Sequence, residues 1–408
     1  HLSACRVAGV KNQALKELDE YEQADSNVRS EEVLEFVKKV LDITLLQLSK
    51  GNVSDRDIEE DIRFVRDEIG KPDFLKQLVL HVQQAADRWA SASKEENGQD
   101  YLFSELCLLI KLGRNAVCTL GFLCCREGKF GVLYDFMTAG NQVLGGYYDW
   151  KTRLRSYFMN LITPSMLAEA FDSLRLGKVA VQTAGWRTDN TMAVPQLVSD
   201  YFLYVDKAYG DRLDVHLRGE TLATPARLGF PAVKFDLFYD GSTGLFKLPF
   251  GFQGWFGLCG ERTIVAFAGT RLLQLGTVFT DAEQIFGPSL IYACAVGMVA
   301  LVAQHMGQGN LFVLGHSLGG GVTQFAVAAN RSNHIEGWGF NSAGLSETSV
   351  RALLTAADVA GGMENVVLHH YVTGADPVSK LGGLVGTVTT IPGSADLGHT
   401  RDDLRQVI

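Results

Sequence analysis

A serine flanked by glycines is the residue whose setting most strongly indicates covalent chemistry. Residues 315–319 read Gly-His-Ser-Leu-Gly, an apolar run (311–314) precedes them, and an amphipathic helical pattern (318–330) follows. A sharp strand-to-helix turn of this kind strains the serine backbone and exposes its hydroxyl, and the glycines prevent collisions between the crossing strand and helix. We therefore predict that Ser317 is a nucleophile and that the backbone N–H of Leu318 faces a developing oxyanion. The alternative is a glycine-rich turn with an inert serine.

The residues around this turn are expected to form strands that alternate with helices. Apolar or alternating runs predict strands at 233–239, 263–269, 311–314, 337–343, 366–372 and 387–392. Helical patterns are expected at 197–210, 284–306, 318–330 and 347–358. Asp-Gly and Thr-Gly pairs within 240–244 indicate a hairpin. Alternation of this kind is typical of βαβ crossovers and predicts a mainly parallel sheet flanked by helices over 195–408.

The first part of the chain has a different pattern. Apolar residues recur there at helical spacing, and few strand signals occur before residue 195. Helices are expected near 33–48, 55–69, 74–91 and 101–123. We predict an all-α helical domain over 1–185, with a regulatory, capping or partner-binding role.

Three motifs occur in the order found in one known family. They are Ile-Val-Ala-Phe-Ala-Gly-Thr (264–270), Gly-His-Ser-Leu-Gly-Gly (315–320) and Thr-Gly-Ala-Asp-Pro-Val-Ser-Lys-Leu (373–381). On these motifs, residues 195–408 resemble the class 3 lipase family of α/β-hydrolases, to which the fungal triacylglycerol lipases belong. The resemblance implies an α/β-hydrolase fold, whereas the helical half resembles no family that we can name.

The resemblance also implies a catalytic triad. Carried over by position, Ser317 is the nucleophile, Asp376 the acid and His399 the base, in the chain order of this fold. Asp376 follows an expected strand, where loops at the carboxyl edge of a sheet gather catalytic groups. This position favours it over four other acidic residues: Asp358, Asp396, Asp402 and Asp403.

Three further histidines are candidates for the base or for its neighbours. His369 and His370 are alternatives to His399, but they alternate within an expected strand, so at least one of them points into packing. His316 flanks the nucleophile, and we expect it to lie beside the base rather than to act as one.

The family resemblance assigns roles to the residues that follow the strand at 263–269. Thr270 would supply the second oxyanion donor through its backbone N–H and its hydroxyl. The segment 271–287 occupies the place of the family's lid, and five of its apolar residues are candidates for acyl-chain contact: Leu272, Leu273, Leu275, Phe279 and Phe286. An ordinary core-facing segment is the alternative interpretation. The chain departs from the family in two respects: it lacks the usual Trp before Asp281, and the spacing from the acid to the base is short. Both departures concern the movement of the lid and the shape of the substrate that the site accepts.

The composition argues against several other classes of function. The 408 residues carry 37 Lys and Arg against 46 Asp and Glu, a net charge of −9, and no basic run could follow a phosphate backbone, so no nucleic-acid partner is expected. The seven cysteines include no Cys-x-x-Cys pair, and neither a metal nor an organic cofactor is expected. The apolar stretch 289–303 is shorter than the roughly 20 residues that a membrane-spanning helix needs. No signal peptide is recognised, so we expect a soluble protein, cytoplasmic or exported as an effector.

These observations predict a serine lipid-ester hydrolase, a lipase or a phospholipase of the A type, that works through an acyl-enzyme. Its substrate would be a lipid or phospholipid ester met in transient contact with a membrane surface. The alternative from another class is a catalytically weak lipase-like scaffold or interaction protein whose helical domain binds a protein partner. A patatin-like Ser-Asp dyad ranks last, because its Gly-rich loop upstream of Ser317 and its Asp-Gly downstream are missing.

Overall fold

The computed structural model describes most of the second half of the chain. The described residues are 164–190, 194–224, 238–247, 252–269, 290–306, 310–360, 363 and 366–408, together with scattered residues between 23 and 134. The helical domain expected over 1–185 therefore lies outside the described residues up to 163, apart from those scattered positions. Thr270 and the expected lid segment 271–287 also lie outside them.

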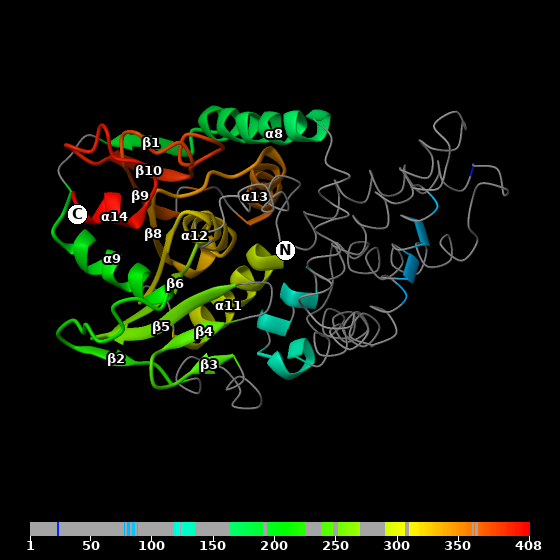
Figure 1. Cartoon of the computed structure of the whole chain (residues 1–408). Coiled ribbons are helices and arrows are strands. Elements are labelled where there is room, and N and C mark those ends of the chain that lie inside the picture. Colours follow the sequence, from blue (N-terminus) through cyan, green and yellow to red (C-terminus); the bar gives the residue numbers. More distant parts are fainter. Residues whose placement is uncertain are drawn as a thin grey trace. The chain divides into compact units, whose positions relative to one another are not determined.

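A ten-stranded mixed sheet forms the centre of the described part (Figure 1). Six strands run parallel in the spatial order β6, β7, β8, β9, β10 and β1. Their bounds are β6 Arg262–Phe267, β7 Leu311–His316, β8 Glu336–Phe340, β9 Val367–Val372, β10 Gly386–Thr390 and β1 Arg187–Asn190. A mainly parallel sheet flanked by helices was expected, and it is compatible with an α/β-hydrolase.

Antiparallel strands extend the sheet beyond β6. Strand β5 (Gln253–Cys259) pairs with β6, and its outer edge is shared by β4 (Leu245–Lys247) and β2 (Glu220–Leu222). Strand β3 (Tyr239–Asp240) forms a hairpin with β4. Gly244 closes this turn with φ of 77°, which confirms the hairpin that the Asp-Gly and Thr-Gly pairs predicted.

Helices cover both faces of the sheet (Figure 1). The helix bounds are α8 Pro164–Thr183, α9 Leu197–Ala208, α11 Leu290–Met306, α12 Leu318–Ala329, α13 Glu347–Ala360 and α14 Arg401–Arg405, with a one-turn 3-10 helix at Arg331–Asn333. Helix α9 packs on one face together with α14, and α12 packs on the other face, where α11 and α13 contact it. No helix in the described ranges is both long enough and apolar enough to cross a membrane.

The alternation of side chains along β8 separates these two faces. Trp338 and Phe340 pack in the cluster that α9 completes. Gly337 faces the other way, where a Cβ would lie 3.0 Å from the side chain of Val327 in α12. Fully burying an aromatic side chain such as Phe340 stabilises the fold by roughly 1.5–3 kcal/mol. The absent side chain at 337 lets the C-terminal part of α12 lie close to the sheet.

Helix α8 lies within the compact unit that contains the sheet, although the sequence assigned its residues to the helical part of the chain. This unit comprises 125–131 and 163–408. The helix packs against α13, and a Cβ at Gly177 would overlap the carbonyl oxygen of Leu345. The close approach at Gly177 is a tertiary contact that helical spacing alone does not reveal.

Candidate active site

Ser317 occupies the turn between β7 and α12 in a strained backbone conformation. Its φ and ψ are 57° and −125°, a region that non-glycine residues rarely adopt and that costs about 1–3 kcal/mol. Backbone hydrogen bonds stabilise this turn: the N–H of Ser317 donates to the carbonyl of Phe340 (3.1 Å), and its own carbonyl accepts from the N–H of Ala343 (2.8 Å). The turn therefore has the shape expected for a nucleophile between a strand and a helix.

The glycines around Ser317 are sterically required. A Cβ at Gly315 would overlap the carbonyl oxygen of Gly319, and a Cβ at Gly319 would overlap the carbonyl oxygen of Phe267 in β6. A Cβ at Gly320 would overlap the hydroxyl of Ser342. The collisions that the spacing predicted are confirmed.

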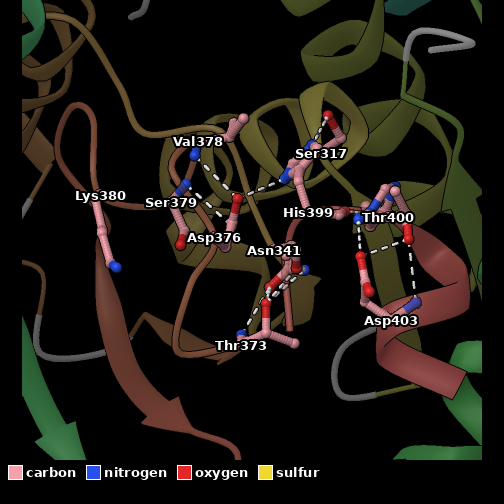
Figure 2. A network of polar contacts seen from close by, with 12 residues as sticks. Ser317, Asn341, Thr373, Asp376, Val378, Ser379, Lys380, His399, Thr400 and Asp403 are labelled. Atoms are coloured by element: carbon pink, nitrogen blue, oxygen red, sulfur yellow. Dashed lines mark hydrogen bonds and ion pairs between the residues drawn. The ribbon is translucent and has the colours of Figure 1, made fainter. Parts of the chain in front are cut away.

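Ser317, His399 and Asp376 meet in a continuous chain of hydrogen bonds (Figure 2). His399 Nε2 lies 2.7 Å from Ser317 Oγ, and His399 Nδ1 lies 2.7 Å from Asp376 Oδ1. A carboxylate only accepts hydrogen bonds, so Nδ1 carries the proton and Nε2 accepts from the serine hydroxyl. The geometry is that of a nucleophile, a general base and an acid that orients the base.

The Asp376 carboxylate is fully buried and multiply hydrogen-bonded. Besides His399, it accepts from the backbone N–H groups of Val378 (2.9 Å) and Ser379 (3.1 Å). Burial by itself would raise the pKa of this carboxyl, but hydrogen bonding and charge interaction with His399, with the bonds from Ser379 and Val378, hold the pKa below its ordinary value. Asp376 is thus kept ionised opposite the imidazole.

His316 lies directly behind His399. The two rings stack with centroids 5.2 Å apart, and His316 Nε2 donates to the backbone carbonyl of His399 (2.9 Å). Burial, reinforced by the charge of His399, lowers the pKa of His316 to about 3, so this ring is neutral and its Nδ1 accepts a hydrogen bond from the hydroxyl of Tyr209 (2.9 Å). As the sequence predicted, His316 lies beside the residue expected to be the base.

The other two candidate histidines are engaged elsewhere. His370 is fully buried, with Nδ1 at 2.9 Å from the hydroxyl of Ser342 and Nε2 at 3.0 Å from the carbonyl of Val385. The ring of His369 packs against Trp338, with centroids 4.8 Å apart. The structure therefore brings His399, and neither of these residues, to Ser317.

The remaining predicted site residues are described in part. Leu318 is the first residue of α12, so its N–H precedes the first acceptor within the helix and lies at the positive end of the helix dipole. Gly269, just beyond β6, approaches Ser317 closely, since a Cβ built on it would lie 2.9 Å from Ser317 Cβ. The second donor Thr270 and the lid candidates lie outside the described residues: Leu272, Leu273, Leu275, Phe279 and Phe286.

Two polar residues that the sequence did not single out hold the chain just before His399. The side chains of Asn341 and Thr373 both donate to the carbonyl of Gly398, the residue before His399. Asn341 directly follows β8 and Thr373 directly follows β9. A polar residue immediately after a buried parallel strand was the signal that could have identified them.

Within the described ranges, no group of three or more His, Cys, Asp and Glu side chains could hold a metal ion.

The sheet, the strand-to-helix turn and the hydrogen-bonded serine define an α/β protein with the features of a hydrolase. A family model described as a Tle-like phospholipase domain, of the phospholipase-like type, matches residues 252–391. The matched range contains Ser317 and Asp376, and His399 follows it. This part of the chain is thus similar to phospholipases, which supports hydrolysis of lipids. No curated protein and no solved structure matches the chain significantly.

Proposed function

We propose that this protein is a serine hydrolase that cleaves carboxylic esters of lipids, of the lipase or phospholipase A type. The observation that carries the proposal is the chain of hydrogen bonds from Ser317 through His399 to Asp376. The similarity of residues 252–391 to a phospholipase domain supports phospholipid as the substrate. Transient contact with a membrane surface, and a role as an exported effector, are parts of the same proposal.

The reaction proceeds in two acyl transfers. His399 Nε2 takes the proton of Ser317 as Oγ attacks the ester carbonyl, and the C–O bond then breaks as His399 returns that proton to the leaving alcohol. Water, deprotonated by His399, next attacks the acyl-enzyme, and His399 returns this proton to Ser317 Oγ as the ester bond breaks and the fatty acid leaves. Asp376 holds the imidazole in the required tautomer and stabilises the imidazolium in both steps.

The oxyanion of each tetrahedral intermediate needs preorganised donors. The N–H of Leu318 at the start of α12 supplies one of them. The resemblance of 264–270 to the class 3 lipase motif supports Thr270 as the second. In known hydrolases the loss of one such donor costs roughly 3–4 kcal/mol of transition-state stabilisation. This arrangement suits attack at an acyl carbonyl, so we propose cleavage of the acyl ester rather than of the phosphodiester.

A fluorophosphonate probe tests the nucleophile. The full chain is expected to be labelled, and Ser317→Ala is expected to lose labelling. Ser342→Ala is the matched control, because Ser342 also hydrogen-bonds to a histidine, His370, but is fully buried. Labelling of the Ser317→Ala variant at the wild-type rate would exclude Ser317.

Phospholipid vesicles test the bond that is cleaved. Mass spectrometry is expected to detect a free fatty acid and a lysophospholipid. Diacylglycerol or phosphatidic acid as the main product would contradict the acyl-ester assignment. A folded wild-type chain with neither labelling nor hydrolysis would instead favour the scaffold interpretation, in which a helical domain binds a protein partner.

A further inference from the structure

Asn341 lies where the three chain segments that carry Ser317, Asp376 and His399 meet. Figure 2 shows it beneath the hydrogen bonds that join these residues. The side chain is fully buried, and the backbone has φ of 42°, which asparagine tolerates better than most residues do. A buried amide at the end of a central strand requires partners for all of its polar atoms.

The first set of partners belongs to the segment of the base. Asn341 Nδ2 donates to the carbonyl of Gly398 (3.0 Å), and Thr373 Oγ1 donates to the same oxygen. His399 follows Gly398 in a segment with no helix or strand. The two hydrogen bonds to this carbonyl therefore fix the peptide group that precedes His399. In a helix or strand, backbone hydrogen bonds would do this instead.

The second set belongs to the segment of the acid. Asn341 Oδ1 accepts from the backbone N–H of Thr373 (2.9 Å), and Nδ2 donates its other hydrogen to Thr373 Oγ1 (3.1 Å). The N–H of Asp376 in turn donates to the carbonyl of Thr373 (3.3 Å). Because the N–H of Thr373 binds the amide oxygen of Asn341, that oxygen faces Thr373 and the amide nitrogen faces the carbonyl of Gly398.

The third connection reaches the nucleophile through the backbone. The N–H of Asn341 donates to the carbonyl of Tyr371 in β9 (2.9 Å). Two residues further on, the N–H of Ala343 donates to the carbonyl of Ser317 (2.8 Å). A shift of the 341–343 segment would therefore move the nucleophile relative to the base.

We infer that Asn341, together with Thr373, is a positioning residue that holds the base segment at the correct distance from the nucleophile and the acid. Asn341 contacts none of the reacting atoms and acts through the backbone of Gly398 and Thr373. The inference rests on the proposed serine-hydrolase function. It predicts that loss of the amide lowers kcat more than it changes KM, because a misplacement of about 1 Å can cost up to roughly a hundredfold in rate.

The test compares Asn341→Gly with Asn330→Gly in the full chain. Glycine adopts the backbone conformation of residue 341 without strain and removes the side chain with its amide, and the same backbone freedom is added in the Asn330→Gly control. Asn330 is a matched control, since it is buried at the other end of α12 and its Nδ2 also donates to two backbone carbonyls, those of Val296 and Ala326. The substrate is a soluble short-chain ester, and the concentration of active sites is determined by titration with a phosphonate. We expect kcat per active site to fall about tenfold or more in Asn341→Gly. We expect kcat to change less than about twofold in Asn330→Gly, and KM to change little in either variant.

A second pair of variants keeps the inference testable if Asn341→Gly does not fold. Thr373→Val removes the hydroxyl that donates to Gly398, whereas Thr373→Ser retains it. The valine variant is expected to lose kcat and the serine variant to recover most of it. Equal kcat for both, or for Asn341→Gly and Asn330→Gly, would overturn the positioning role.

A spectroscopic readout separates this inference from the proposed function. The downfield proton resonance of His399 Nδ1–H reports the hydrogen bond to Asp376 without turnover. It is expected to persist in Asn330→Gly and to broaden or disappear in Asn341→Gly. Failure of the wild type to hydrolyse any ester would refute the proposed function, whereas an unchanged resonance in Asn341→Gly would refute the inference alone.

Discussion

His399 Nε2 lies 2.7 Å from Ser317 Oγ, although 82 positions separate the two residues in the chain. The contact joins a turn at the end of β7 to an irregular segment just before α14 (Figure 2). Its proton-transfer geometry depends on which histidine nitrogen carries the hydrogen, and Asp376 determines that.

Asp376→Asn is expected to lower kcat by about 10³–10⁴-fold, as loss of the acid does in triads where the imidazole then adopts the wrong tautomer. Steady-state kinetics on a soluble ester measure the effect. Asp396→Asn is the control, since Asp396 is an exposed carboxylate in the same C-terminal region. Equal activity of the two variants would contradict the role of Asp376.

Gly319→Ala is expected to destabilise the protein by roughly 1–3 kcal/mol, because the added methyl overlaps the carbonyl of Phe267 in a close-packed crossing. Without the overlap, alanine would stabilise the helix by about 1 kcal/mol relative to glycine. A decrease in the free energy of unfolding therefore indicates the steric overlap. Urea unfolding measures it. In the control Gly241→Ala, the nearest atom to the new methyl is 3.9 Å away, and unfolding should change by less than about 0.5 kcal/mol.

Tyr209→Phe is expected to lower kcat by roughly tenfold, since the hydroxyl accepts from the N–H of Gly269 (2.8 Å) and donates to His316, which in turn holds the carbonyl of His399. Tyr201→Phe removes a hydroxyl from α9, the helix that ends just before Tyr209, and this hydroxyl accepts from Arg262 (3.2 Å). Both variants should lose some stability, and only the first should lose kcat. A similar loss of kcat in both would mean that the effect comes from the packing of α9.

Stability is expected to fall as the pH decreases below about 6.5. Burial lowers the pKa of His316 from 6.5 to about 3 and that of His370 from 6.5 to about 4, so the unfolded chain binds protons at these imidazoles that the folded chain does not bind. Each imidazole then contributes a slope of up to about 1.4 kcal/mol per pH unit, with stability increasing as the pH rises.

Urea unfolding between pH 4 and 6.5 measures that slope. Burial lowers the pKa of His369 as well, so three imidazoles act in the same direction, and His370→Gln is expected to reduce the slope by removing one of them. An unchanged slope in His370→Gln would show that His370 is not the origin of this pH dependence.

Five of the six predicted strands correspond to the parallel strands β6 to β10, whereas of the strand expected at 233–239 only residues 238 and 239 are described, and Tyr239 begins β3. The strands without a prediction include β1 and β5. Strands β6, β7 and β9 are apolar runs because both of their faces are covered. Strand β1 reads Arg-Thr-Asp-Asn and is exposed at its two central residues, so it carries no apolar signal. In β5, Gly254 and Gly257 interrupt the pattern where aromatic side chains pack against the strand.

From the amino-acid sequence one can locate Ser317 and its flanking glycines, because the chemistry of a tight turn resides in adjacent residues. The family resemblance pointed to Asp376 and His399, but the tertiary structure is what brings His399 rather than His370 to that serine. It also shows that Asn341 and Thr373 hold the carbonyl of Gly398 and that His316 holds the carbonyl of His399. These contacts join residues 25 to 83 positions apart, so the local pattern can mark a polar residue at a strand end but cannot show which distant residue it binds.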